Sequence, residues 1–287
     1  MRCKFLIEEK RNKMKIGLFT SGYQRYQIEQ AFKDATRFGY DFIELWGGRP
    51  DGYVYDILED QGVYLKSLIS KYSMPIYIYT PEMNAYPFNF MVGSEKQRQS
   101  SVHYVCKCIE AAVLLGAEYT LISAGHSGYY RTKKEVEERL ILSLKEIVSF
   151  AEKNNHKVIL EALTHFESNV INKSSELKWA IDEINSPFLV GMIDVVPPFV
   201  IQEPMIEYFN KLGNKIVHMH VVDSDGYSDT HMIPNEGKIP LKELLLEVSN
   251  MDFEPTITIE LVTAYLNEPS LYAKKAIDQL NALLYKG

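Results

Sequence analysis

The sequence predicts one α/β domain folded as a (β/α)8 barrel. Eight short runs of β-branched and aromatic residues alternate with longer segments whose apolar residues recur at helical spacing. Eight strand–helix pairs in about 270 residues match the size and order of such a barrel. The main alternative, an open doubly wound sheet, normally carries a Gly-rich phosphate turn after its first strand. Here that turn reads Thr20-Ser21-Gly22-Tyr23, which favours the barrel.

Each predicted strand is an apolar run that ends near a polar or charged residue. The strands are expected at residues 15–20, 40–45, 74–80, 118–123, 157–162, 189–194, 216–222 and 256–261. Apolar faces predict helices near 28–35, 136–147 and 177–184, the last with Ser174 or Ser175 as its N-cap. Further helices are expected at 53–72, 95–115, 203–212, 241–250 and 269–284. We expect a single barrel domain at 14–287, with residues 1–13 forming an N-terminal extension.

Composition narrows the class of protein. The 287 residues are 46% hydrophobic and 24% charged, which is typical of a globular chain. No apolar run approaches the roughly 20 residues of a membrane span, and no secretory signal pattern stands at the N-terminus. Three cysteines (Cys3, Cys106 and Cys108) do not form a disulfide framework, so we expect a cytoplasmic protein. A net charge of −7 argues against nucleic-acid and membrane partners.

Four consecutive predicted strands, the fifth to the eighth, end in residues that bind metals. They end at or near Glu161, Asp194, His220 and Glu260, about one strand–helix unit apart. Active sites of such barrels lie at the C-terminal ends of the strands, so we expect these four side chains to converge there.

Convergence of three carboxylates would be strongly repulsive without a cation. Three oxygen ligands and one imidazole, with no thiolate, favour a borderline-hard ion with open coordination positions. We therefore predict one divalent metal cation. Mn2+ fits best, and Co2+, Ni2+, Mg2+ and Zn2+ remain alternatives.

At these residues the chain resembles the xylose-isomerase-like barrel superfamily and, within it, the ketose 3-epimerases. The run Glu161-Ala-Leu-Thr-His-Phe-Glu167 is similar to the family's first catalytic Glu and to the Glu that follows it six residues later. Gly191-Met-Ile-Asp194, His218-Met-His220 and Ile259-Glu260-Leu261 match the other three metal positions.

Longer loop segments resemble the members of that family that interconvert fructoselysine and psicoselysine. These segments are FTSGYQRYQIEQAF, IELWGGRP, YTPEMNAYPFN, SDTHMIPNEGKIPL and ELVTAYLNEPSLYA. The resemblance implies a small-molecule sugar or Amadori-type substrate, proton transfer at C3 through an enediolate, and a homo-oligomer.

Roles follow for individual residues. Glu161 and Glu260 are expected to act as the catalytic acid and base from opposite sides of the substrate, while Asp194 and His220 hold the metal. Five further side chains are predicted to bind substrate: Glu167, His231, Glu44, Trp46 and His126. A capping role for Glu44 and a core position for Trp46 are the structural alternatives.

Two positions depart from the family pattern. Pro197 stands where many relatives have His, three residues after the metal Asp, and Gly226 stands where several 3-epimerases place a substrate-binding Arg. Contacts to the rest of the sugar should therefore differ. The alternative functions are another ketose 3-epimerase, a sugar or sugar-phosphate isomerase, and an apurinic endonuclease. The last would need a basic face and more metal histidines.

Overall fold

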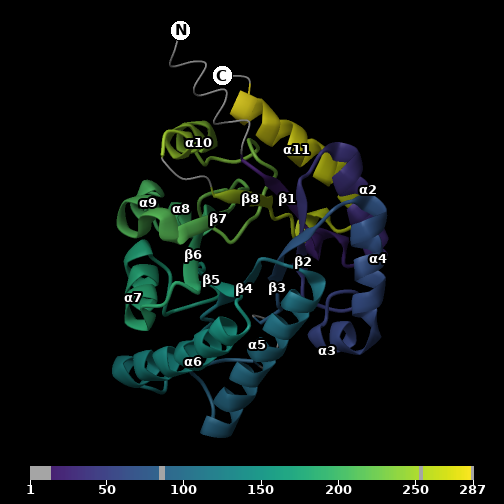
Figure 1. The fold of residues 1–287 in the computed structure, drawn as a ribbon. Coiled ribbons are helices and arrows are strands. Elements are labelled where there is room, and N and C mark those ends of the chain that lie inside the picture. The colour runs from purple at the N-terminus through teal and green to yellow at the C-terminus, as the bar shows by residue number, and fades with distance from the viewer. Residues whose placement is uncertain (1–13, 84–87, 252–254, 286–287) are drawn as a thin grey trace.

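The computed structural model describes residues 14–83, 88–251 and 255–285, and its strands form a closed, parallel eight-stranded barrel (Figure 1). The strands pair in chain order, and β1 also pairs with β8, with Gly17 opposite Thr258. They are β1 (Ile16–Phe19), β2 (Phe42–Trp46), β3 (Ile76–Thr80), β4 (Tyr119–Ser123), β5 (Lys157–Glu161), β6 (Leu189–Asp194), β7 (Ile216–His220) and β8 (Thr256–Ile259). All eight predicted strands are confirmed. The predicted extension at residues 1–13 lies outside the described residues.

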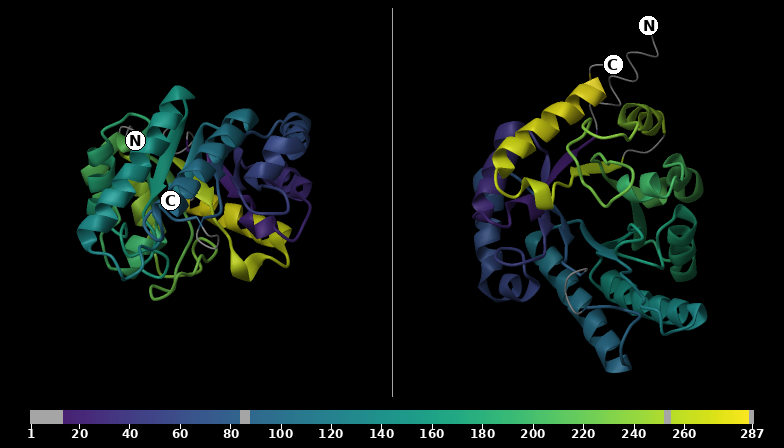
Figure 2. Two further views of the ribbon diagram at one scale, coloured as in Figure 1. Left: turned by 90° about the horizontal axis from the view of Figure 1, so that it is seen from below. Right: turned by 180° about the vertical axis from the view of Figure 1, so that it is seen from behind.

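The longer helices surround the barrel, as the two further views show (Figure 2). They are α2 (Ile28–Phe38), α4 (Gly62–Tyr72), α5 (Glu95–Leu115), α6 (Lys133–Lys153), α7 (Ser174–Ile184), α9 (Ile206–Leu212), α10 (Leu241–Ser249) and α11 (Pro269–Tyr285). The last helix, α11, contacts both α10 and α2, which closes the outer ring. In the described part of the chain, no helix combines the length and apolar character needed to cross a membrane.

Local structure differs from the predictions in three places. The helix predicted at 53–72 is three segments, because a π turn at Ile57–Gln61 (η2) separates α3 (Val54–Asp56) from α4. Neither predicted serine caps α7, since the helix begins at Ser174 itself and the Glu176 carboxylate accepts the backbone N–H groups of Asn172 and Lys173. An unpredicted short helix, α8 (Val196–Val200), follows β6 and has prolines in its first turn, where no N–H is needed.

The barrel interior is a small apolar cluster directly below the polar residues at the strand ends. Phe42, Ile159 and Met192 belong to it, together with Ile78, Tyr119, Leu121 and Val190. Residues two apart on a strand point to the same side. Since Ile159 and Met192 point into the interior, Glu161 and Asp194, each two residues further along its strand, point inward as well. A separate and larger cluster fills the space between strands and helices.

Phe42 fills the bottom of this interior because its neighbour on β1 is a glycine. A Cβ added at Gly17 would fall 2.1 Å from the Phe42 ring, whereas the ring itself is 1% exposed. The pair shows that the interior is packed to the point where one extra carbon does not fit.

Candidate active site

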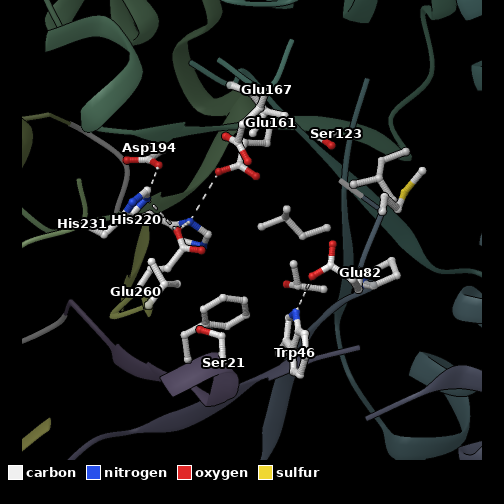
Figure 3. A pocket seen from close by; sticks show the side chains of 18 of the residues that line it. Ser21, Trp46, Glu82, Ser123, Glu161, Glu167, Asp194, His220, His231 and Glu260 are labelled. Carbon is white, nitrogen blue, oxygen red and sulfur yellow. Dashed lines mark hydrogen bonds and ion pairs between the residues drawn. The ribbon is translucent and has the colours of Figure 1, made fainter. Parts of the chain in front are cut away.

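Four side chains converge at the C-terminal ends of β5 to β8. Glu161 ends β5, Asp194 ends β6, His220 ends β7, and Glu260 directly follows β8. One potential ligand atom from each lies within 4.8 Å of the others. All four line a cavity of about 410 Å³, and Figure 3 shows them along one side of it. The structure thus brings together the four residues predicted to bind the metal.

The donor atoms fit a divalent cation. Nδ1 of His220 lies 2.8 Å from a Glu260 oxygen and 3.4 Å from a Glu161 oxygen. It is nevertheless buried without a properly oriented hydrogen bond to any described group. A buried nitrogen facing two carboxylates, with a third nearby, is the arrangement that a shared metal ion would satisfy.

Glu44 lies beneath His220 and fixes the orientation of its ring. Its carboxylate is fully buried and faces Nε2 of His220 at 3.1 Å and Nε2 of His218 at 3.2 Å. The Thr80 hydroxyl donates a third hydrogen bond at 2.7 Å. Burial raises the pKa of Glu44, but His220 and His218 outweigh it and hold that pKa well below its ordinary value.

This placement differs from the predicted contact between Glu44 and substrate. Glu44 lies two residues before the end of β2 and points into the barrel one layer below the cavity, whose lining does not include it. By binding Nε2 of His220, it leaves Nδ1 directed at the carboxylates, which is the usual function of an outer carboxylate behind a metal-binding histidine.

The carboxylates in the cavity are electrostatically crowded. Burial raises the pKa of Glu161 to about 7, against a lowering by His220. Burial, with Asp229 and Glu161 nearby, raises the pKa of Glu167 to about 8. Burial would also raise the pKa of Glu260, but His220 and His231 outweigh it and lower that pKa below the usual range. A dication among these groups would favour the ionised form of each carboxylate.

Three of the residues predicted to bind substrate line the cavity: Glu167, His231 and Trp46. Nε2 of His231 lies 3.0 Å from an Asp194 oxygen and 3.4 Å from a Glu260 oxygen, so this imidazole borders the four converging residues. Trp46 lies on the opposite side of the cavity (Figure 3). Their positions allow contact with a bound molecule.

His126 lies away from the cavity lining. Its Nδ1 accepts the backbone N–H of Gly128 at 3.0 Å, and its ring meets Tyr129 edge-on. It therefore shapes the loop between β4 and α6, and the predicted contact of His126 with substrate has no counterpart in this geometry.

Several cavity residues were not predicted. Glu82 follows β3 and accepts a hydrogen bond from the Trp46 indole N–H at 2.9 Å. Ser123 ends β4, and Ser21 belongs to the turn after β1. The rule that identified the metal residues, a polar residue at the end of a strand, also points to Glu82 and Ser123.

The two departures from the family pattern have different structural settings. Pro197 is buried in the first turn of α8. Gly226 has a φ of +81°, and a Cβ there would lie 3.1 Å from the Phe199 ring. A left-handed backbone disfavours any side chain, so the loop after β7 is built around glycine at this position.

Fold and site together define a class of barrel. Residues 32–283 match the model of the xylose isomerase-like TIM barrel family, and the chain belongs to this family. Within it, the chain is an isomerase of the sugar 3-epimerase group, as its relatives show.

The relatives include one that is similar over nearly its whole length. A fructoselysine 3-epimerase from Shigella flexneri is 46% identical over 271 residues, which cover 94% of this chain and 98% of the relative. A solved D-tagatose 3-epimerase-like protein superposes with a TM-score of 0.81 at 22% identity, over 94% of this chain and 97% of that one. D-psicose 3-epimerase from Clostridium cellulolyticum H10 gives a TM-score of 0.79 at 16% identity, over 95% and 99% of the two chains. These two structures support the fold.

Proposed function

We propose that this protein interconverts fructoselysine and psicoselysine by inverting C3, with one divalent cation held by Glu161, Asp194, His220 and Glu260. The convergence of these four side chains in one cavity is the observation that carries the proposal. The 46% identity to a fructoselysine 3-epimerase supports the choice of substrate. Mn2+ is the favoured ion because the ligands are three carboxylates and one imidazole.

The chemistry is a proton exchange at a carbon next to a ketone. A bound dication would polarise the C2 carbonyl and offset the negative charge that develops on the substrate oxygens as the C3 proton leaves. Asp194 and His220 position that ion. Glu44 keeps His220 in the required orientation through its bond to Nε2.

Glu161 and Glu260 carry the proton. They belong to β5 and β8 and approach Nδ1 of His220 from different strands, at 3.4 and 2.8 Å. One Glu, as an ionised carboxylate, removes the C3 proton from one face of the substrate. The other Glu, as a carboxylic acid, donates its proton to C3 of the resulting enediolate on the opposite face. The C3 configuration inverts, and no proton is gained or lost overall.

Neighbouring polar groups are suited to hold the substrate hydroxyls. Glu167 and His231 both line the cavity beside the four proposed metal ligands, and His231 presents a ring that Asp194 and Glu260 hold in place.

We also propose a cytoplasmic location, which the two free cysteines, Cys106 and Cys108, support.

Isotope exchange tests this function. The Mn2+-loaded protein is incubated in D2O with fructoselysine and, separately, with free ketoses, and the sugars are analysed by NMR and mass spectrometry. We expect psicoselysine to form from fructoselysine with deuterium at C3. Retention of hydrogen at C3 together with product formation would contradict the proton-exchange chemistry, and absence of turnover of fructoselysine would contradict the substrate assignment.

Three Glu→Gln variants accompany this experiment: two test the proposed proton carriers, and the third is the matched charge control. Glu161→Gln and Glu260→Gln should lose turnover, while Glu118→Gln should retain it. Glu118 is exposed and directly precedes β4, at the opposite end of the barrel, so it controls for the loss of one negative charge.

A further inference from the structure

The ionisable groups that line the cavity are strongly acidic as a set. The described lining residues include two histidines and six carboxylates: Glu82, Glu161, Glu167, Asp194, Asp229 and Glu260. A divalent metal ion would bind three of these carboxylates and neutralise two of their negative charges. Glu82, Glu167 and Asp229 are not among these ligands, and each adds negative charge to the small cavity when it is ionised. The low dielectric there makes such a charge act more strongly than in water.

Glu82 is separated from the other acidic residues by the width of the cavity. It follows β3, and its partner Trp46 ends β2. In a barrel paired in chain order, β2 and β3 lie opposite β6 and β7, which supply Asp194 and His220. Figure 3 shows this arrangement, with Glu82 and Trp46 facing the acidic and histidine side chains across the open space.

Trp46 holds the Glu82 carboxylate at the cavity wall. The indole N–H donates to one Glu82 oxygen at 2.9 Å, and both residues line the cavity. The Tyr104 hydroxyl donates to the backbone carbonyl of Glu82 at 3.2 Å and fixes the same segment from below. The carboxylate therefore lies at the edge of the indole ring, where it can form an ion pair with an ammonium group.

We propose that Glu82, positioned by Trp46, recognises an ammonium group of the substrate, and that the cavity selects cationic sugar conjugates over neutral and phosphorylated sugars. In this proposal the reacting carbons of the sugar lie at the four proposed metal ligands, and its amine-bearing substituent extends across the cavity toward Glu82 and Trp46. The proposal rests on the proposed function for the position of the sugar. The new element is the assignment of Glu82 as the residue that binds the charged amine of the substrate.

Two amines of fructoselysine have this chemistry, the secondary amine attached to C1 and the α-amine of the lysyl part. Four compounds distinguish them. Fructoselysine has both amines, Nα-acetyl-fructoselysine keeps only the C1 amine, fructosyl-butylamine also keeps only the C1 amine but lacks the amino-acid end, and D-fructose has neither. Fructose 6-phosphate serves as the anionic competitor.

The experiment measures kcat/KM and equilibrium binding of these compounds to the wild type and to Glu82→Gln, with Glu118→Gln as the matched charge control. Binding is followed by isothermal calorimetry, so that it is measured even for a compound that is not turned over. We expect Glu82→Gln to lower kcat/KM and affinity for fructoselysine by about 10- to 100-fold, the range for a charged hydrogen bond. D-fructose should change by less than about 2-fold, because it has no ammonium group.

The pattern across compounds identifies the amine. A full loss with fructosyl-butylamine indicates the C1 amine. Equal values of wild type and variant for fructosyl-butylamine and Nα-acetyl-fructoselysine, together with a loss for fructoselysine, indicate the α-amine.

Equal loss for fructoselysine and D-fructose would overturn the proposal, because it would mean that Glu82 only maintains the shape of the cavity. Unchanged affinity for fructoselysine, or tight binding of fructose 6-phosphate, would overturn it as well. Failure of the wild type to epimerise fructoselysine would instead contradict the proposed function, while the binding series would still decide the role of Glu82.

Discussion

Replacing Glu44 by Gln should weaken metal binding without removing any proposed metal ligand. The Glu44 carboxylate accepts hydrogen bonds from the Thr80 hydroxyl at 2.7 Å and faces Nε2 of His220 at 3.1 Å and of His218 at 3.2 Å. Glutamine keeps one acceptor oxygen and turns an NH2 group toward a second donor. The variant therefore loses at least one charged hydrogen bond in a fully buried position.

The size of the effect follows from two independent estimates. A hydrogen bond to a charged group contributes about 1.5–3 kcal/mol. Loss of an outer partner of a metal-binding histidine typically lowers metal affinity by about 10- to 100-fold, which corresponds to about 1.4–2.8 kcal/mol. The two agree, so we expect the Kd for Mn2+ or Co2+ to rise by about 10- to 100-fold.

The assay is competition for the metal between the protein and a fluorescent chelator, with circular dichroism to verify folding. Glu118→Gln is the charge control and should bind metal like the wild type. Thr80→Val removes one donor to Glu44 and leaves the imidazoles in place, so its Kd should rise less than that of Glu44→Gln. A folded Glu44→Gln protein whose Kd stays within 2-fold of the wild type would refute the idea that Glu44 orients His220.

Three further predictions concern catalysis, acid stability and packing. Glu161→Gln and Glu260→Gln should each lower kcat at least about 100-fold while the far-ultraviolet circular dichroism spectrum is retained, because each removes one of the two proposed proton carriers. Burial lowers the pKa of His156 to about 4, whereas the pKa of an unfolded histidine is about 6.5. Protonation therefore favours the unfolded chain, and the free energy of unfolding falls by up to about 3 kcal/mol as the pH drops from above 6.5 toward 4. His156→Gln should therefore flatten the acid side of the stability–pH curve measured by urea unfolding. Gly17→Ala should lower the free energy of unfolding by about 1–3 kcal/mol, because the new Cβ would meet the Phe42 ring, and Phe42→Leu should recover part of the loss in the double variant.

Each of these has a control or an outcome that contradicts it. For acid stability, the control is His103→Gln, because His103 is an exposed histidine on α5. This substitution should leave the acid side of the stability–pH curve unchanged. If the acid side of the stability–pH curve is the same in His156→Gln as in the wild type, burial of His156 is not the cause of the loss of stability at low pH. For packing, if the changes in the free energy of unfolding for Gly17→Ala and Phe42→Leu simply add in the double variant, the new Cβ at residue 17 does not compete with the Phe42 ring for space. For catalysis, near-normal turnover by either variant would refute the two-carboxylate scheme.

The sequence was informative about the fold because a parallel barrel repeats one simple pattern. Each strand is buried on both faces and is therefore an almost uninterrupted apolar run. The polar residue that ends such a run must lie at the rim, and Glu161, Asp194 and His220 were found in this way. The same pattern gives no information on depth, so Glu44 was expected at the surface of the cavity although it lies one layer below it.

Loop residues were harder to predict because their positions depend on contacts distant in sequence. His231 was predicted from the family resemblance and not from a local pattern, because it reaches the cavity through a loop that an isolated antiparallel pairing of Asp223 with Met232 turns back toward β6. No local periodicity reveals that pairing. The π turn within 53–72 was also hidden, because one extra residue per turn leaves the overall apolar spacing helical.

The most direct test of this account is a crystal structure of the Mn2+-loaded protein, with the ion located by anomalous scattering. We predict one strong peak at coordinating distance, within about 2.5 Å, of an oxygen from each of Glu161, Asp194 and Glu260 and of Nδ1 of His220. A peak bound by other side chains, or coordination of His220 through Nε2 in place of Nδ1, would contradict it.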